Sequence, residues 1–87
     1  MDATTRNAIF EAATQSTYWQ RLNIGLRTKV SHGGYTYTVD VPSGDDPAQA
    51  LITYREGYGG TEFLSEVATW AQTMLIVDTA MGALRVH

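Results

Sequence analysis

The stretch Leu22–Val41, with the sequence LNIGLRTKVSHGGYTYTVDV, decides the fold because apolar and polar residues alternate on both sides of a glycine pair. A period of two residues is typical of a strand with one buried face. The alternating positions are Leu22, Ile24, Leu26, Thr28 and Val30 before the glycines, and Tyr35, Tyr37, Val39 and Val41 after them. We therefore predict a β-hairpin with strands over residues 22–30 and 35–41.

The connection Ser31-His32-Gly33-Gly34 supports this prediction, since glycine supplies the positive φ that a tight hairpin turn needs. A two-residue turn at Gly33-Gly34 places Val30 opposite Tyr37, whereas a four-residue loop places Val30 opposite Tyr35. Both registers put the two apolar sets on one face, and a slip of one residue does not.

A short helix is predicted after the hairpin. Pro42 ends the second strand because proline lacks the N–H donor. Asp46 is suited to the N-cap, Pro47 to the first helical position and Gln49 to the third, which closes a pair like a capping box. Gly57 is suited to end this helix as a left-handed cap.

A long C-terminal helix is predicted over residues 61–81, because apolar residues recur there at alternating steps of four and three. The recurring residues are Phe63, Val67, Trp70, Met74, Val77, Met81 and Leu84. An alternative ends the helix near Thr73 and makes Met74–Val77 a third strand, since β-branched residues favour sheets. Spacing alone does not separate these two interpretations.

The N-terminal segment completes the predicted fold. Several alanines favour a helix over residues 4–20, and Asp2, Thr4 and Thr5 offer N-cap oxygens. The chain is thus expected to form one α+β domain over residues 1–87. Its order is an N-terminal helix, a β-hairpin, a short helix and a long C-terminal helix, with the helices packed on one face of the hairpin.

The composition excludes several classes of protein. The 87 residues carry a net charge of −3 and include no cysteine, which excludes disulfides, thiolate nucleophiles and cysteine-bound zinc. No apolar run is long enough for a secretory signal or a membrane span. We therefore expect a soluble, cytoplasmic, small acidic protein that does not enter membranes.

Chemistry-bearing residues are few. His32 lies in the predicted turn and His87 ends the sequence, so neither is held as a catalytic base needs to be. Glu62 and Glu66 lie one turn apart on the predicted helix, where the helix dipole already accounts for them. The glycine-rich stretch 57–61 precedes a helix but lacks the lysine of a phosphate-binding loop. We predict no catalytic residue, no metal site and no cofactor.

Aromatic and arginine side chains point instead to a binding surface, since they are enriched at interface hot spots. The predicted partner-binding residues are Tyr54, Arg55, Tyr58, Tyr18 and Arg21. The apolar stripe of the long helix is wider than a two-stranded hairpin can cover, which indicates self-association. The residues predicted for this homodimer contact are Phe63, Val67, Trp70, Met74 and Val77.

These features predict a non-enzymatic protein-binding module that acts by surface occlusion or assembly. In size, acidity, lack of cysteine and lack of catalytic motifs, the chain resembles the small inhibitors that phages encode against host defence complexes, anti-CRISPR proteins among them. The resemblance is one of composition. The alternative is a small nucleic-acid-binding protein that uses the polar face of the hairpin, where Arg27, Lys29 and His32 lie near the turn; its affinity would fall steeply with salt.

Overall fold

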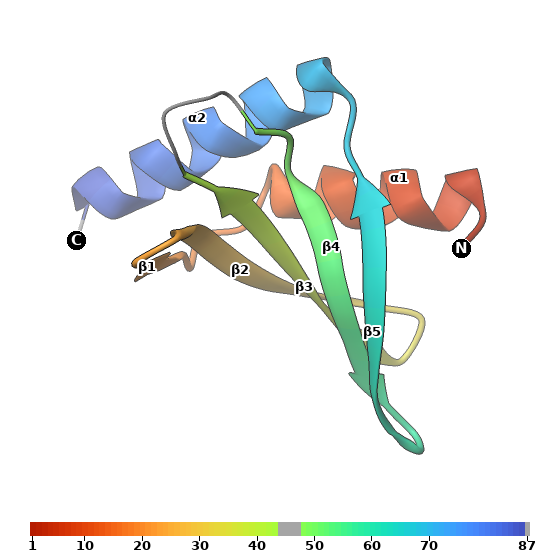
Figure 1. Cartoon of the computed structure of the whole chain (residues 1–87). Helices are drawn as coiled ribbons and strands as arrows, with labels where there is room; N and C mark the ends of the chain where they lie inside the picture. Colours follow the sequence, from red (N-terminus) through yellow and green to blue (C-terminus); the bar gives the residue numbers. More distant parts are fainter. Residues whose placement is uncertain (44–47, 87) are drawn as a thin grey trace.

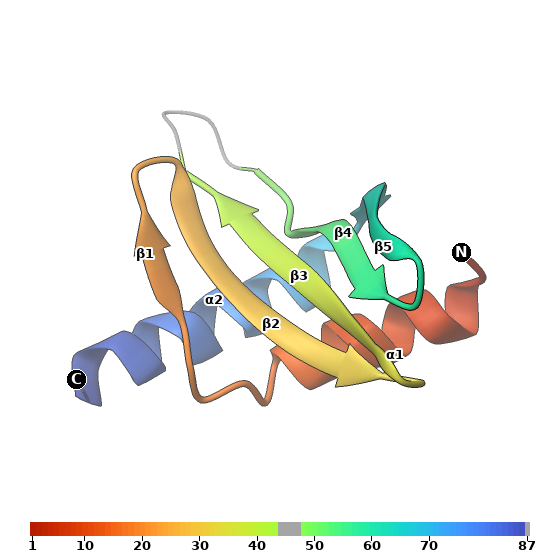
Figure 2. The same cartoon turned by 90° about the horizontal axis from the view of Figure 1, so that it is seen from below.

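A computed structural model describes residues 1–43 and 48–86, and it confirms the α+β class. Five antiparallel strands lie in the order of the sequence, and both helices pack on one face of their sheet (Figure 1). Figure 2 looks onto the opposite face, which no helix covers. The elements are α1 (Ala3–Ala13), β1 (Gln20–Leu22), β2 (Gly25–His32), β3 (Tyr35–Pro42), β4 (Leu51–Gly57), β5 (Gly60–Val67) and α2 (Trp70–Val86).

Helix α1 begins as predicted but ends seven residues early. Asp2 is its N-cap and accepts a hydrogen bond of 2.8 Å from the Thr5 N–H. The helix ends at Ala13, because hydroxyl residues follow whose side chains compete for backbone hydrogen bonds. The chain then returns to the sheet, where the Thr28 hydroxyl donates to the Tyr18 carbonyl. The prediction of a helix to Gln20 was therefore wrong.

The β2–β3 hairpin is confirmed in its two-residue register. Val30 lies opposite Tyr37, and Gly33 and Gly34 both have positive φ, as a turn of this kind requires. The predicted first strand is divided, however. Leu22 belongs to β1, and after a turn at Asn23-Ile24 the rest of the predicted strand forms β2, which pairs with β1. Gly25 makes this possible, since a Cβ there would lie 2.1 Å from the carbonyl oxygen of Val41.

The predicted short helix is instead β4, which forms a second hairpin with β5. Gly57 lies opposite Gly60, so Tyr58 and Gly59 form the turn where a joint between helices was predicted. Leu51–Tyr54 is rich in β-branched and aromatic side chains, which pack well in a sheet. The predicted helix cap at Asp46 and Pro47 lies outside the described residues.

Helix α2 begins nine residues later than predicted, because residues 60–67 form β5. The Thr69 hydroxyl accepts from the Gln72 N–H and the Gln72 side chain accepts from the Thr69 N–H, a reciprocal cap. The alternative of a strand over Met74–Val77 is wrong, since these residues are helical. The helix also continues past Met81, its predicted end, to Val86.

The core lies between the sheet and the two helices. Its largest fully buried side chains come from both helices and the central strands, and include Phe10, Ile9, Ile52, Ile76 and Val39. Buried polar contacts fix α2 against the sheet: the Ala50 N–H donates to the Thr73 hydroxyl over 3.0 Å. Within the described residues, neither helix has the length and apolarity to cross a membrane.

Candidate interaction surfaces

The side of α2 that faces away from the sheet exposes several large apolar side chains. Trp70, Met74 and Leu75 are 53%, 58% and 58% exposed, and Met81 is also exposed. We call these four residues the outer face of α2. The inner side of the same helix buries Thr73, Ile76 and Ala80. Helix α2 therefore exposes large apolar side chains that a single copy of the chain does not cover, together with the charged Asp78 and Arg85.

The residues predicted for self-association do not form one helical stripe. Trp70 and Met74 lie on the outer face of α2, as a contact surface requires. Phe63 and Val67 lie on β5 instead, and Val77 packs partly against the core. The structure thus divides the predicted set between a helix and a strand.

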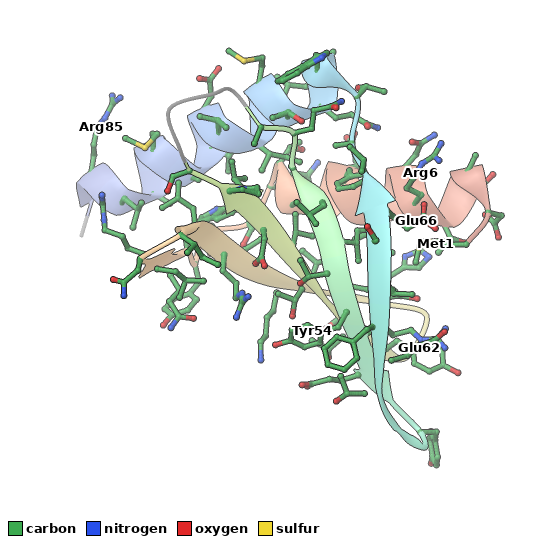
Figure 3. All side chains as sticks on the ribbon, in the orientation of Figure 1. Met1, Arg6, Tyr54, Glu62, Glu66 and Arg85 are labelled. Carbon is green, nitrogen blue, oxygen red and sulfur yellow. The ribbon has the colours of Figure 1, made fainter. Side chains whose placement is uncertain are left out.

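The uncovered face of the sheet carries a row of side chains from four neighbouring strands. The Arg27 guanidinium of β2 donates to both carboxylate oxygens of Asp40 on β3, over 2.7 and 2.9 Å. Arg27 also lies 6.0 Å from the ring centroid of Tyr54 on β4. The Tyr54 ring meets Phe63 of β5 edge-to-face, with 6.4 Å between centroids. Figure 3 shows Tyr54 on the side of the sheet away from the helices.

Two properties of this row bear on recognition. Hydrogen bonding to Asp40 raises the pKa of Arg27. The guanidinium therefore stays charged, and its charge is already paired with that of Asp40. Phe63 at the end of the row is 85% exposed. The contact between Tyr54 and Phe63 was not predicted, although pairing of two extended strands across the glycine-rich turn would bring these residues together.

The predicted partner-binding residues fall into two groups. Tyr54, Arg55 and Tyr58 share the β4–β5 hairpin, whose tip extends beyond the helices with Tyr58 fully exposed (Figure 1). Tyr54 and Arg55 point to opposite faces, since neighbouring strand residues alternate. Tyr18 and Arg21 are exposed near β1, at the other edge of the sheet.

Arg55 is engaged on the helix side of the hairpin. It pairs with Glu62 and lies over the ring of Tyr35, 4.6 Å from the centroid. A hydrogen bond that the Arg55 guanidinium donates to the Tyr37 hydroxyl, with the charge of Glu62 as a further cause, raises the pKa of Arg55. Its guanidinium is thus held within the fold.

A polar hollow of about 400 Å³ lies beside Arg55, between the start of α1 and the ends of the two hairpins. Its lining includes Asp2, His32 and Glu62, which are far apart in the sequence. His32 is exposed, and Glu62 is paired with Arg55. The hollow could admit water or a small polar molecule, but its charges are of both signs and partly paired.

The prediction that Glu62 and Glu66 lie one helical turn apart was wrong. Both lie on β5, and four residues of strand separate them by about 13 Å. Glu62 pairs with Arg55, and Glu66 lies 3.3 Å from the amino group of Met1 (Figure 3). Across residues 1–43 and 48–86, no three His, Asp or Glu side chains gather as a metal site would require.

The residues of the nucleic-acid alternative are only partly brought together. Arg27 and Lys29 share the uncovered face of β2, because they are two residues apart on a strand. His32 faces the helix side, where it is paired with Tyr35. Arg27 is neutralised by Asp40, which leaves Lys29 as the unshared charge of this set on that face.

Comparison of the chain with protein-family models, with curated proteins and with solved structures finds no match.

Proposed function

We propose that the protein is a non-enzymatic protein-binding module whose partner covers the outer face of α2. The observation that carries this proposal is the exposure of Trp70, Met74, Leu75 and Met81 on a helix whose other side is already buried. Contiguous exposed apolar residues are typical of interaction sites.

The chemistry of this face favours a protein partner. Tryptophan is enriched among interface hot spots, and methionine adapts its flexible side chain to irregular apolar surfaces. The charged residues within α2 are Asp78 and Arg85, one of each sign. The face therefore offers apolar area rather than a field that attracts phosphates.

The nucleic-acid alternative has weaker support. Phosphate binding depends on several unshared basic side chains, and the chain has nine acidic residues against six basic ones. The best-placed arginine on the hairpin, Arg27, donates to Asp40. Lys29 alone would provide little of the salt-dependent affinity that this function requires.

The experiment compares capture by the wild type and by a variant of the outer face, Met74→Ser with Leu75→Ser. Both side chains are exposed, so we expect the variant to fold. Immobilised wild type should retain a specific protein from lysate, and the variant should retain at least tenfold less, measured by quantitative mass spectrometry. Ile24→Ser, at an exposed apolar residue on another part of the surface, is the matched control and should retain the wild-type amount.

Two results would oppose the proposal. Equal capture by the wild type and the double variant would exclude the outer face of α2 as the contact. Capture that disappears after nuclease treatment would favour the nucleic-acid alternative.

Occlusion of a partner and assembly into a larger complex would both use this face. An inhibitor of the phage type would lower the partner's activity in proportion to binding, which an activity assay of the captured protein tests. The proposal includes a cytoplasmic location, which fractionation of cells expressing the tagged chain tests.

A further inference from the structure

The two edges of the sheet differ in a way that matters for assembly. An edge strand presents unpaired backbone N–H and C=O groups, and natural proteins shield such edges by keeping them short or charged. The edge strand β1 has three residues, whereas β5 at the other edge has eight. The β5 edge is therefore the one suited to pair with a further strand.

The charges that could guard the β5 edge are engaged within the chain. Glu62 is paired with Arg55, and Glu66 with the amino group of Met1. On the uncovered face, the same strand exposes Phe63 at 85% and Val67 at 51%. An added strand would cover these apolar side chains without leaving either carboxylate unpaired.

We propose that β5 pairs antiparallel with β5 of a second copy of this chain, with Phe63 opposite Phe63 on the two-fold axis. This inference uses a surface separate from the outer face of α2 and does not rest on the proposed function. The register follows from the sequence of β5, because residues directly opposite one another interact most strongly in an antiparallel pair.

Charge selects this register among the neighbouring ones. With Phe63 at the centre, seven residues of each strand overlap, Glu62 lies opposite Leu64, and Glu66 lies opposite Gly60. A register centred on Leu64 places Glu62 opposite Glu66, and one centred on Glu62 places two copies of that carboxylate together. Like charges directly opposite one another destabilise a strand pair. A register centred on Ser65 avoids this conflict but overlaps only five residues.

The pairing is also complementary in its side chains. The edge-to-face pair of Tyr54 and Phe63 within one copy would meet its equivalent across the junction, so that four rings form one cluster. Thr61 would lie opposite Ser65, so hydroxyl groups flank the rings. The result is a continuous sheet of ten strands with the helices of both copies on one face.

Cysteine cross-linking tests the register directly, because the chain has no cysteine of its own. Phe63→Cys should form a disulfide-linked dimer on mild oxidation. Thr61→Cys mixed with Ser65→Cys should cross-link, whereas each of these two alone should give at least tenfold less dimer. Ile24→Cys, exposed beside the β1 edge, is the control and should form at least tenfold less disulfide-linked dimer than Phe63→Cys.

Solution mass tests the interface itself. The wild type should sediment at about twice 9.6 kDa at micromolar concentration, and Phe63→Lys should raise the dissociation constant at least thirtyfold. Ile24→Lys should leave the dimer intact, as should Met74→Ser with Leu75→Ser on the outer face of α2. A monomeric wild type would overturn the inference, and so would a dimer that the outer-face variant abolishes and Phe63→Lys does not.

Discussion

At the scale of the residue, two buried threonines on neighbouring strands have different hydrogen bonding. Thr38 is fully buried, and its hydroxyl oxygen has no partner within the described residues. The Thr28 hydroxyl donates to the carbonyl of Tyr18 over 2.8 Å. A buried polar atom without a partner carries a desolvation cost that a bonded one recovers.

Valine has nearly the shape of threonine, so the same substitution should act with opposite sign at the two sites. We expect Thr38→Val to raise the free energy of unfolding by about 1 kcal/mol. Thr28→Val should lower it by about 1 kcal/mol, because the Tyr18 carbonyl loses one of its two hydroxyl donors and the Ser16 hydroxyl loses its contact with Thr28. Urea unfolding of the three proteins checks both signs, and a loss of stability in Thr38→Val would show that its hydroxyl has a partner in solution.

At the scale of the element, the start of α1 depends on a titratable cap. The hydrogen bond from the Thr5 N–H, followed by that from the Thr5 hydroxyl, lowers the pKa of Asp2 from its ordinary value of 3.8. Because the pKa of Asp2 is lower in the folded chain than in the unfolded chain, the cap stabilises the fold fully above pH 3.8. This stabilisation is lost as the pH falls through the pKa of Asp2 in the folded chain. Asp2→Ala should therefore lower the melting temperature at pH 7, and the difference should narrow in acid. Glu11→Ala, at the other end of α1, is the control for a change of charge alone; an equal effect in both variants would contradict a capping role.

The elements also show what the sequence could and could not specify. The β2–β3 hairpin was predictable because its alternation is unbroken and its turn glycines fix the register. The β4–β5 hairpin was not, since a register shift beside Thr53 interrupts the period of two. The spacing of Phe63, Val67, Trp70 and Met74 misled for a different reason. A step of four keeps residues on one face of a strand and almost on one face of a helix, so the same pattern fits β5 followed by α2 and a single helix.

The candidate surfaces were predictable in kind but not in place. Aromatic and apolar residues in excess of a thin core had to be exposed somewhere, and Tyr58, Phe63 and Trp70 are. Which of them share a surface depends on strand pairing between distant residues, as the contact of Tyr54 with Phe63 shows. Composition and local period do not contain that information.

At the scale of the whole molecule, a domain of 87 residues has a total stability of roughly 4–13 kcal/mol, so each large core side chain matters. Ile76 and Leu75 are neighbours on α2, but Ile76 is fully buried and Leu75 is 58% exposed. We expect Ile76→Ala to lower the free energy of unfolding by about 2–4 kcal/mol and Leu75→Ala to change it by less than about 0.5 kcal/mol. Urea unfolding at low protein concentration measures both changes in free energy while the outer face of α2 is uncovered. When the partner is bound, Leu75→Ala should also lower the free energy of unfolding, because the Leu75 side chain of the complex is then removed from water. A large loss from Leu75→Ala in the isolated chain would mean that the outer face of α2 is already covered within it, and that the partner binds elsewhere.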